Sequence, residues 1–254
     1  MFKTENISTV AAWLHHAQHI VAFTGAGIST PSGIPDFRSS DSGMWATVDP
    51  MTVASIYGFR HNPQAFYDWV RPLIQLTHDA KSNPAHLALS KLEQINKLDA
   101  VITQNIDMLH TRAGNKTVYE LHGHMREATC INCFHIHDGM VILEKFLEDG
   151  KVPHCVKCNG IIKPNVILFG EQLPIVELQN AKKVARNSDL MLVIGSSLEV
   201  APASDIPVIA KQSGAKIVIV NLEPTTLDSM ADIVIYGDAA EILPAIVQSL
   251  EQLT

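Results

Sequence analysis

The chain has 254 residues, of which 46% are hydrophobic and 18% are charged, a composition typical of a globular protein and not of a disordered or collagen-like one. Its 26 acidic residues outnumber its 19 basic ones, which argues against a surface that coats nucleic acid. No apolar run reaches the ~18 residues of a membrane-spanning helix. Residues 1–6 lack the basic start and apolar block of a secretion signal. We therefore expect a cytoplasmic protein that contacts neither membranes nor nucleic acid.

Short apolar runs rich in β-branched residues recur along the chain, and amphipathic segments separate them. The runs predict strands at residues 19–23, 99–103, 117–121, 165–169, 189–194, 215–220 and 232–236. Continuous apolarity indicates strands that are covered on both faces, as in a parallel sheet with helices on each side. Amphipathic helices are expected from Pro84 onward, over residues 174–187 and over residues 239–253. We therefore predict an α/β fold with a doubly wound, mostly parallel, Rossmann-like sheet.

Two segments interrupt this alternation of strands and helices. Residues 39–83 have a helical pattern with many aromatic side chains, and residues 123–160 carry all four cysteines. We interpret them as a helical insertion and a cysteine-containing module that together form a smaller lobe. The Rossmann-like domain then consists of three pieces, namely residues 1–38, 84–122 and 161–254.

The four cysteines form two Cys-x-x-Cys pairs, Cys130 with Cys133 and Cys155 with Cys158. Four converging thiolates are the ligands that tetrahedral Zn²⁺ prefers, and they leave no open position for a catalytic water. The sequence therefore predicts a structural zinc ion that stabilises the module of residues 123–160. The alternatives are four unrelated thiols, or two disulfides in an exported protein. Three nearby histidines are interpreted as solvated loop residues: His135, His137 and His154.

A glycine-rich turn follows the first predicted strand. Gly25 and Gly27 form a Gly-x-Gly turn where the backbone can approach a pyrophosphate at a helix N-terminus. This pattern alone is weak, because a plain tight turn has the same sequence and Thr30 replaces the third small residue of the usual fingerprint. Two later strands also end in small or polar residues, at 195–197 and 221–223. Three such ends at one sheet edge favour a dinucleotide over a lone phosphate.

A series of short motifs makes the sequence resemble the sirtuin (Sir2) family. The motifs are Gly25-Ala-Gly-Ile-Ser29, Ser32-Gly-Ile-Pro-Asp-Phe-Arg38, Thr103-Gln-Asn-Ile-Asp107, His122-Gly123, the two Cys-x-x-Cys pairs, Phe169-Gly-Glu171, Gly195-Ser-Ser-Leu198 and Asn221-Leu-Glu223. The resemblance covers nearly the whole chain, from about Ile20 to Ala239, and is to compact prokaryotic-type members. The resemblance implies an NAD-dependent protein-lysine deacetylase. In that reaction nicotinamide leaves NAD, the acyl group moves to the ribose, and water releases free lysine and O-acetyl-ADP-ribose.

The resemblance also implies the roles of individual residues. His122 would be the catalytic base, helped by Asn105 and Asp107, although these two also fit a helix cap after a strand. Gly123 leaves room beside His122 for close approach of a ligand. The implied cofactor-binding residues are Gly25, Ala26, Gly27, Ser29, Thr30, Phe37, Arg38, Gln104, Asn105, Ile106, Asp107, His122, Gly195, Ser196, Ser197, Asn221, Leu222, Glu223, Asp238 and Ala239.

A peptide that carries acetylated lysine is the expected partner, bound as an extended strand between two segments of the chain by main-chain pairing. Binding of this kind depends on the backbone of the peptide more than on its side chains. For Val166, ordinary core packing is an equal alternative. The implied substrate residues are Val166, Phe169, Gly170, Glu171, Leu198 and Val200.

Three features depart from the family pattern. Members that remove malonyl or succinyl groups carry Tyr-x-x-Arg, but here Arg71 follows Tyr67 by four positions, and Pro72 disfavours helical geometry at Arg71. We therefore expect uncharged acyl groups, acetyl first. The loop of residues 39–45 is one residue longer than usual. Lys163 stands where arginine is common, and the sequence assigns it no role.

Two other functions stay open at the level of sequence. One is protein mono-ADP-ribosylation, in which the same pocket passes the ribose to a nucleophile other than acyl-lysine. The other is a non-enzymatic NAD-binding regulator that keeps the fold without turnover. The presence of His122, Asn105 and Asp107 argues against the regulator.

Overall fold

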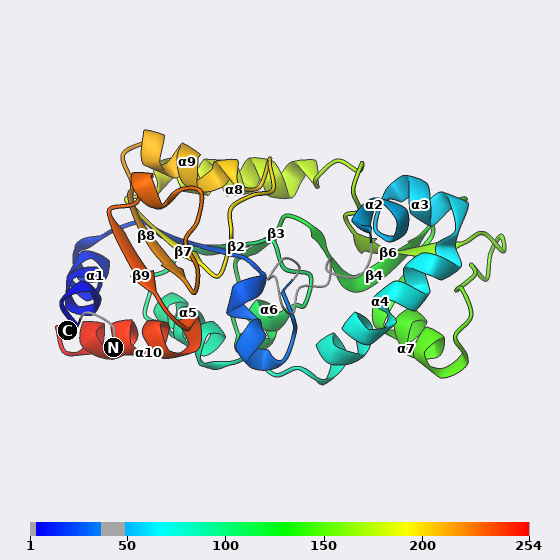
Figure 1. Ribbon diagram of the computed structural model, residues 1–254, viewed down its shortest axis with the longest axis horizontal. Helices are drawn as coiled ribbons and strands as arrows, with labels where there is room; N and C mark the ends of the chain where they lie inside the picture. Colours follow the sequence, from blue (N-terminus) through cyan, green and yellow to red (C-terminus); the bar gives the residue numbers. More distant parts are fainter. Residues whose placement is uncertain (1–3, 37–48, 254) are drawn as a thin grey trace.

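The structure, a computed structural model, describes residues 4–36 and 49–253. Phe37, Arg38 and the loop of residues 39–45 lie outside the described residues. The described chain forms two sheets of different kinds, one at each end of an elongated molecule (Figure 1). The α/β fold class predicted from the sequence is confirmed.

The larger sheet is parallel and doubly wound. Its strands are β1 (Ile20–Thr24), β2 (Ala100–Thr103), β3 (Val118–Glu120), β7 (Leu190–Ile194), β8 (Lys216–Asn221) and β9 (Ile233–Tyr236). They lie in the order β3-β2-β1-β7-β8-β9, and every pairing is parallel. Every residue of β1 and β7 is buried, which explains their uninterrupted apolar sequence. The strand order reverses between β1 and β7, and such a reversal opens a crevice at the carboxyl ends of the strands.

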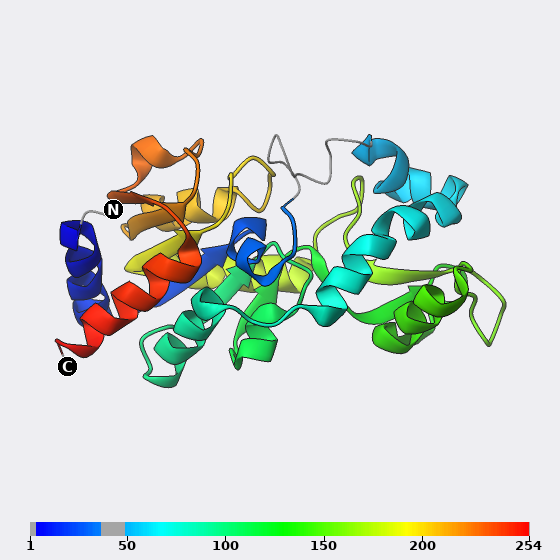
Figure 2. The same cartoon turned by 60° about the horizontal axis from the view of Figure 1, so that its bottom comes forward.

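Helices cover both faces of this sheet (Figures 1 and 2). One face packs on α1 (Thr4–His16), α5 (Pro84–Gln94) and α10 (Ala239–Glu251), and the other on α8 (Ile175–Asn187) and α9 (Asp205–Gln212). Asn83 begins α5 by accepting a hydrogen bond from the Ala85 N–H, and its Nδ2 donates to the Ile28 carbonyl oxygen at 2.7 Å. This N-cap therefore ties α5 to the turn after β1. Among residues 4–36 and 49–253, none of the helices combines the length and the apolarity required to cross a bilayer.

The smaller sheet is antiparallel and has the order β5-β4-β6. Its strands are β4 (Gly123–Cys130), β5 (Ile136–Asp138) and β6 (Ile162–Val166). The helices α2 (Pro50–Val53), α3 (Ile56–His61), α4 (Pro63–Asp79) and α7 (Gly139–Asp149) accompany it (Figure 1). Phe59, Phe66, Tyr67 and Phe146 are fully or almost fully buried in the core that joins these elements. The short elements are α6 (Leu109–Ala113), η1 (Ala26–Ile28), η2 (Thr30–Ser32) and η4 (Asp228–Met230).

Two local predictions are wrong. The apolar run at 165–169 was expected in the parallel sheet, but strand β6 pairs antiparallel with β4, and Phe169 instead forms an isolated bridge with Ser55. An apolar run shows that a segment is buried and not which sheet buries it. The second error concerns Arg71, because α4 continues through Pro72 to Asp79. The buried face around Leu73 and Ile74 holds the helix together despite the lost hydrogen bond.

Candidate active site

A cavity of about 830 Å³ lies at the carboxyl ends of the parallel strands, and residues from both lobes line it. Its volume lies within the range typical of small-molecule sites. The edge of the sheet at which the sequence predicts a nucleotide site therefore carries a cavity. The predicted site residues that line it are Gly25, Ala26, Gly27, Thr30, Gln104, Asn105, Ile106, His122, Val166, Phe169, Gly170, Glu171, Gly195, Ser196, Ser197, Val200, Asn221, Leu222 and Glu223.

The turn after β1 packs directly against the turn after β7. The Gly27 N–H donates to the Gly195 carbonyl oxygen at 2.8 Å. Gly195 has a φ of +60°, and a Cβ there would lie 2.2 Å from the Ile28 nitrogen. Two backbones can approach this closely only where neither residue has a side chain. Glycine at these positions is therefore required by contact between two turns, a requirement that an isolated tight turn does not impose.

Asn105 and Asp107 belong to a buried hydrogen-bond network at the end of β2. The Asn105 Nδ2 atom donates to the Gly25 carbonyl oxygen and to Ser29 Oγ, both at 3.1 Å. Ser29 Oγ in turn donates to Asp107 at 2.7 Å, and Asp107 also accepts the Leu109 N–H at the start of α6 at 2.9 Å. Burial raises the pKa of the Asp107 carboxyl, whereas these two hydrogen bonds oppose the shift. Asp107 thus accepts the first N–H of α6 and orders the turn after β1 at the same time.

The ring of His122 is oriented by a backbone carbonyl. Its Nδ1 atom lies 2.9 Å from the Gln104 carbonyl oxygen. A carbonyl only accepts, so Nδ1 carries the hydrogen and the neutral ring has its lone pair on Nε2. The next residue, Gly123, has a φ of +77°, and a Cβ there would lie 2.0 Å from the Asn165 carbonyl oxygen. A half-buried imidazole that can accept a proton at Nε2 thus lines the cavity.

Side chains of α4 form the apolar end of the cavity, and the sequence analysis did not predict this contribution. Phe66, Trp69, Val70 and Leu73 occupy one face of that helix and line the cavity. Their spacing is the signal of an amphipathic helix, which by itself also fits ordinary core packing. The cavity therefore has a polar end at the strand termini and an apolar end in the smaller lobe.

Tyr67 and Arg71 belong to another face of α4, and neither lines this cavity. The Tyr67 hydroxyl donates to the Ile162 carbonyl oxygen at 2.8 Å, and burial raises the pKa of this phenol. The Arg71 guanidinium donates to the Leu147 carbonyl oxygen and lies 5.5 Å from the centre of the Phe146 ring. Both side chains thus join α4 to its neighbours in the smaller lobe.

The remaining predicted site residues that the structure describes do not line the cavity. Ser29 and Asp107 are buried in the network at the end of β2. Leu198 is also buried and has a φ of +60°. Asp238 caps α10 by accepting the Ala240 N–H at 2.7 Å, and Ala239 packs in the core beneath the sheet.

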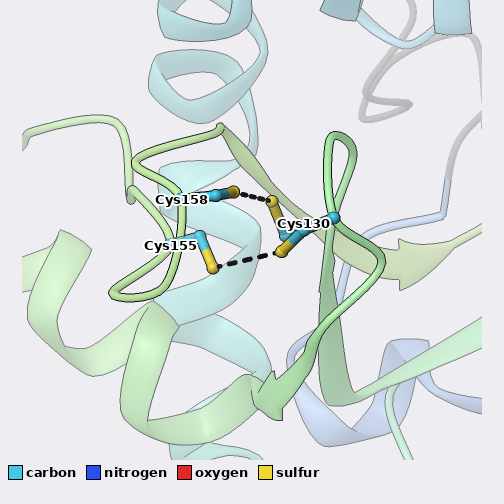
Figure 3. A group of neighbouring side chains, drawn as sticks. Cys130, Cys155 and Cys158 are labelled. Carbon is cyan, nitrogen blue, oxygen red and sulfur yellow. Dashed lines mark hydrogen bonds between the residues drawn. The ribbon is translucent and has the colours of Figure 1, made fainter.

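The four cysteines form a compact sulfur cluster in the smaller lobe (Figure 3). All four Sγ atoms lie within 4.8 Å of one another, with 3.5 Å between Cys130 and Cys158 and 3.7 Å between Cys133 and Cys155. Zn–S bonds of about 2.3 Å in a tetrahedron place sulfur atoms about 3.8 Å apart, whereas a disulfide needs about 2.05 Å. The four cysteines are free.

Backbone donors also surround these sulfur atoms. The N–H groups of Asn132, Lys157 and Gly160 point to the Sγ atoms of Cys130, Cys155 and Cys158 at 3.4 to 3.5 Å. Such donors stabilise thiolates, the form in which cysteine binds metal. The donor set therefore fits a structural zinc ion and excludes the disulfide alternative.

Known proteins resemble this chain over nearly its whole length. The model of the Sir2 family matches residues 25–202. A protein of Archaeoglobus fulgidus named NAD-dependent protein deacylase 2 is 46% identical over 250 residues, which is 98% of this chain and 98% of the relative. The solved structure of Sir2Af2 bound to a myristoylated histone peptide has a TM-score of 0.84 at 41% identity and covers 98% of each chain. A Sir2 complex with a p53 peptide and NAD+ has a TM-score of 0.86 at 39% identity, covering 99% of this chain and 100% of that one. This chain belongs to the Sir2 family.

Proposed function

We propose that this protein is an NAD-dependent protein-lysine deacetylase that transfers the acyl group to ADP-ribose and releases nicotinamide and O-acetyl-ADP-ribose. The observation that carries the proposal is the position of His122. Its ring has the lone pair on Nε2 and lines the same cavity as the two glycine turns and the segment of residues 166–172. The names of the relatives, an NAD-dependent deacylase and a Sir2 complex with peptide and NAD+, agree with it.

NAD supplies the ribose, whose C1′ atom loses nicotinamide and accepts the acyl oxygen. The turns of residues 25–30 and 195–197 are proposed to hold its diphosphate, and residues 221–223 its second ribose. Gln104, Asn105 and Ile106 would surround the nicotinamide, since an amide needs paired donors and acceptors in a dry site. Asp107 and Ser29 act behind them by holding Asn105 in place. Phe37, Arg38, Asp238 and Ala239 stay predicted cofactor residues.

His122 is proposed to remove a proton from a ribose hydroxyl at Nε2. The Gln104 carbonyl oxygen fixes the ring and stabilises the imidazolium that forms, because it accepts the Nδ1 hydrogen in both protonation states. This contact comes from the same segment that carries Asn105. The base and the nicotinamide pocket are therefore positioned by one stretch of chain.

The peptide is proposed to bind as a strand between residues 170–172 and 198–200 through main-chain hydrogen bonds. Glu171, Gln172, Glu199 and Val200 all line the cavity, as this arrangement requires. Recognition of this kind depends on an accurate backbone position and makes few demands on side chains.

Uncharged acyl groups are the proposed substrates. Within the described ranges, no lysine or arginine lines the cavity, and Tyr67 and Arg71 are engaged elsewhere. The apolar face of Phe66, Trp69, Val70 and Leu73 further favours longer aliphatic chains as well as acetyl. A relative with 41% identity binds a myristoylated peptide. Each additional buried methylene would strengthen binding by up to about fourfold.

The cysteine cluster is proposed to hold structural zinc, and four free thiols of this kind favour the cytoplasm, where thiols stay reduced. We also propose the domain division expected from the sequence. In it, residues 1–38, 84–122 and 161–254 bind NAD and residues 39–83 and 123–160 form the smaller lobe, except that β6 (Ile162–Val166) pairs with β4 and therefore belongs to the smaller lobe.

The test is incubation with NAD and peptides that carry acetyl-, decanoyl- or succinyl-lysine, followed by mass spectrometry of the peptide and assay of nicotinamide. Loss of acetyl and decanoyl mass with equimolar nicotinamide release is the expected result, with the succinyl peptide unchanged. Label from NAD on protein with an unchanged acetyl peptide would indicate mono-ADP-ribosylation instead. Bound NAD with neither signal would indicate a non-enzymatic regulator.

A further inference from the structure

Lys163 is a lysine in β6 whose side chain is only 11% exposed. Its Nζ atom donates to the Val166 carbonyl oxygen at 2.7 Å and to the Pro164 carbonyl oxygen at 3.1 Å, and lies 3.1 Å from Glu171 Oε2. An ammonium group has three hydrogens, and each of these three acceptors can receive one. Burial lowers the pKa of this lysine, whereas the carboxylate of Glu171 opposes the shift. Lys163 is thus a fully engaged cation inside the fold.

The carboxylate of Glu171 links Lys163 to the turn that follows β6. Glu171 Oε2 also accepts the Leu168 N–H at 2.9 Å, and the Glu171 N–H donates to the Leu168 carbonyl oxygen at 3.0 Å. Gly170 has a φ of +87° within this turn. One lysine therefore binds the beginning of the segment of residues 166–171 through Val166, and its end through Glu171.

The same segment forms one wall of the proposed active site. Residues 166–172 all line the cavity, and the Ile167 N–H donates to the His122 carbonyl oxygen at 2.9 Å. Lys163 itself does not line that cavity. It lines a second cavity of about 630 Å³, with which the first shares Val166, Ile167 and Glu171. Val166, Ile167 and Glu171 thus lie between two cavities, and backbone in such a position needs support that close packing does not provide.

We propose that Lys163 is a positioning residue for peptide binding, holding the segment of residues 166–172 at a set distance from His122. The inference rests on the proposed deacetylase function. Main-chain pairing tolerates little displacement of the backbone, so loss of the ammonium should weaken the peptide far more than NAD. NAD is proposed to contact the turns after β1, β2, β7 and β8, which Lys163 does not touch.

The test compares Lys163→Met, which keeps the length of the side chain, with Lys163→Arg, which keeps the charge. Lys211→Met is the matched control, because Lys211 also pairs with a carboxylate that accepts a backbone N–H, that of Asp232, but lines neither cavity. The measurements are the KM of an acetyl-lysine peptide, the KM of NAD, kcat, and the Kd of a fluorescent acetyl-lysine peptide by anisotropy.

The expected result for Lys163→Met is an increase of about tenfold in the peptide KM and Kd, with the NAD KM changed less than about twofold. Lys163→Arg should restore most of the peptide affinity, since its guanidinium also donates to carboxylate and carbonyl oxygens. Lys211→Met should leave all four values unchanged.

Three results would overturn the inference: an unchanged peptide KM in Lys163→Met, an equal rise in both KM values, or no recovery in Lys163→Arg. If Lys163→Met does not fold, Lys163→Gln, which also removes the charge, must show the same selective loss of peptide affinity. Peptide binding by the unmodified protein without turnover would refute the proposed function, while the Kd comparison would still decide the role of Lys163. Absence of peptide binding would refute both.

Discussion

The backbone of Gly25 lies so close to that of Gly195 that a Cβ at position 25 would be 2.7 Å from the Gly195 carbonyl oxygen. It would also be 2.8 Å from the Ser196 Cβ. None of these atoms belongs to the far end of a flexible side chain that could turn away. Gly25→Ala is therefore expected to separate the turns after β1 and β7 and to weaken NAD binding by at least about tenfold.

Calorimetric titration with NAD checks this expectation. Gly214→Ala is the control, because a Cβ there meets nothing within 4 Å although Gly214 has a φ of +101°. It should cost about 1 kcal/mol of stability and leave the NAD affinity unchanged. Equal NAD affinity in Gly25→Ala and the unmodified protein would show that the contact between the two turns is not needed for binding.

His122→Ala should reduce kcat by about 10²- to 10⁴-fold, the range typical of a lost general base. The Kd values of NAD and peptide should change little, because the variant removes a proton acceptor and leaves the glycine turns and the wall of residues 166–172 in place. His124→Ala is the control, since His124 lines the second cavity and not the first. Deacetylation that survives His122→Ala but not His124→Ala would contradict the assignment of the base.

Removal of zinc should unfold the smaller lobe. Cys155 is buried, and Cys155→Ser deletes one of four sulfur ligands, so the variant should lose its zinc and melt at a lower temperature. Metal analysis and thermal unfolding monitored by circular dichroism test this. His154→Ala should retain zinc, because His154 is not part of the sulfur cluster. A metal-free protein with unchanged melting would contradict a structural role for zinc.

Acid should destabilise the protein through two buried histidines, His86 of α5 and His110 of α6. The rings of His86 and His110 lie 4.8 Å apart, and burial lowers the pKa of His86 to about 4 and that of His110 well below 6.5. In the unfolded chain both titrate near pH 6.5, so below that pH the unfolded state binds protons that the folded state excludes. The free energy of unfolding should therefore fall as the pH falls from about 6.5 to about 4, by roughly 3 kcal/mol for His86.

Urea unfolding at several pH values between 7.5 and 4.5 measures this loss. His86→Gln should flatten the profile, because the variant has no proton to gain at that position. Leu89→Ala, in the same helix, should instead lower stability at every pH by about 3 kcal/mol through the cavity it creates. A profile for His86→Gln that is parallel to that of the unmodified protein would contradict the prediction.

Several elements could be predicted from the sequence to within a residue or two. The runs at 19–23 and 189–194 became β1 and β7, and the helix expected from Pro84 begins there. These segments are buried on both faces or begin at a strong cap, so local composition and tertiary context agree. For the segment at 165–169, local composition and tertiary context disagree. Strand β6 ends at Val166, and the residues that follow line the cavity.

The candidate site divides in the same way. Glycine turns, a histidine followed by glycine, and paired cysteines are recognisable because each imposes its requirement within a few neighbouring residues. The apolar end on α4 and the role of Lys163 were beyond prediction. Phe66 and Leu73 have the same helical spacing whether they face a core or a cavity. The role proposed for Lys163 depends on its contacts with Val166 and Glu171, which the sequence does not show.

By itself the sequence determined the type of fold and the types of functional group: a parallel sheet with glycine turns, one histidine beside a glycine, and a set of four thiols. Only the tertiary structure decided which helix faces line the cavity, which groups Tyr67 and Arg71 bind, and which side chains contact the segment of residues 166–172. The physical reason is that backbone requirements and ligand types are properties of a residue and its near neighbours. Cavities and buried ion pairs instead arise where segments distant along the chain come together.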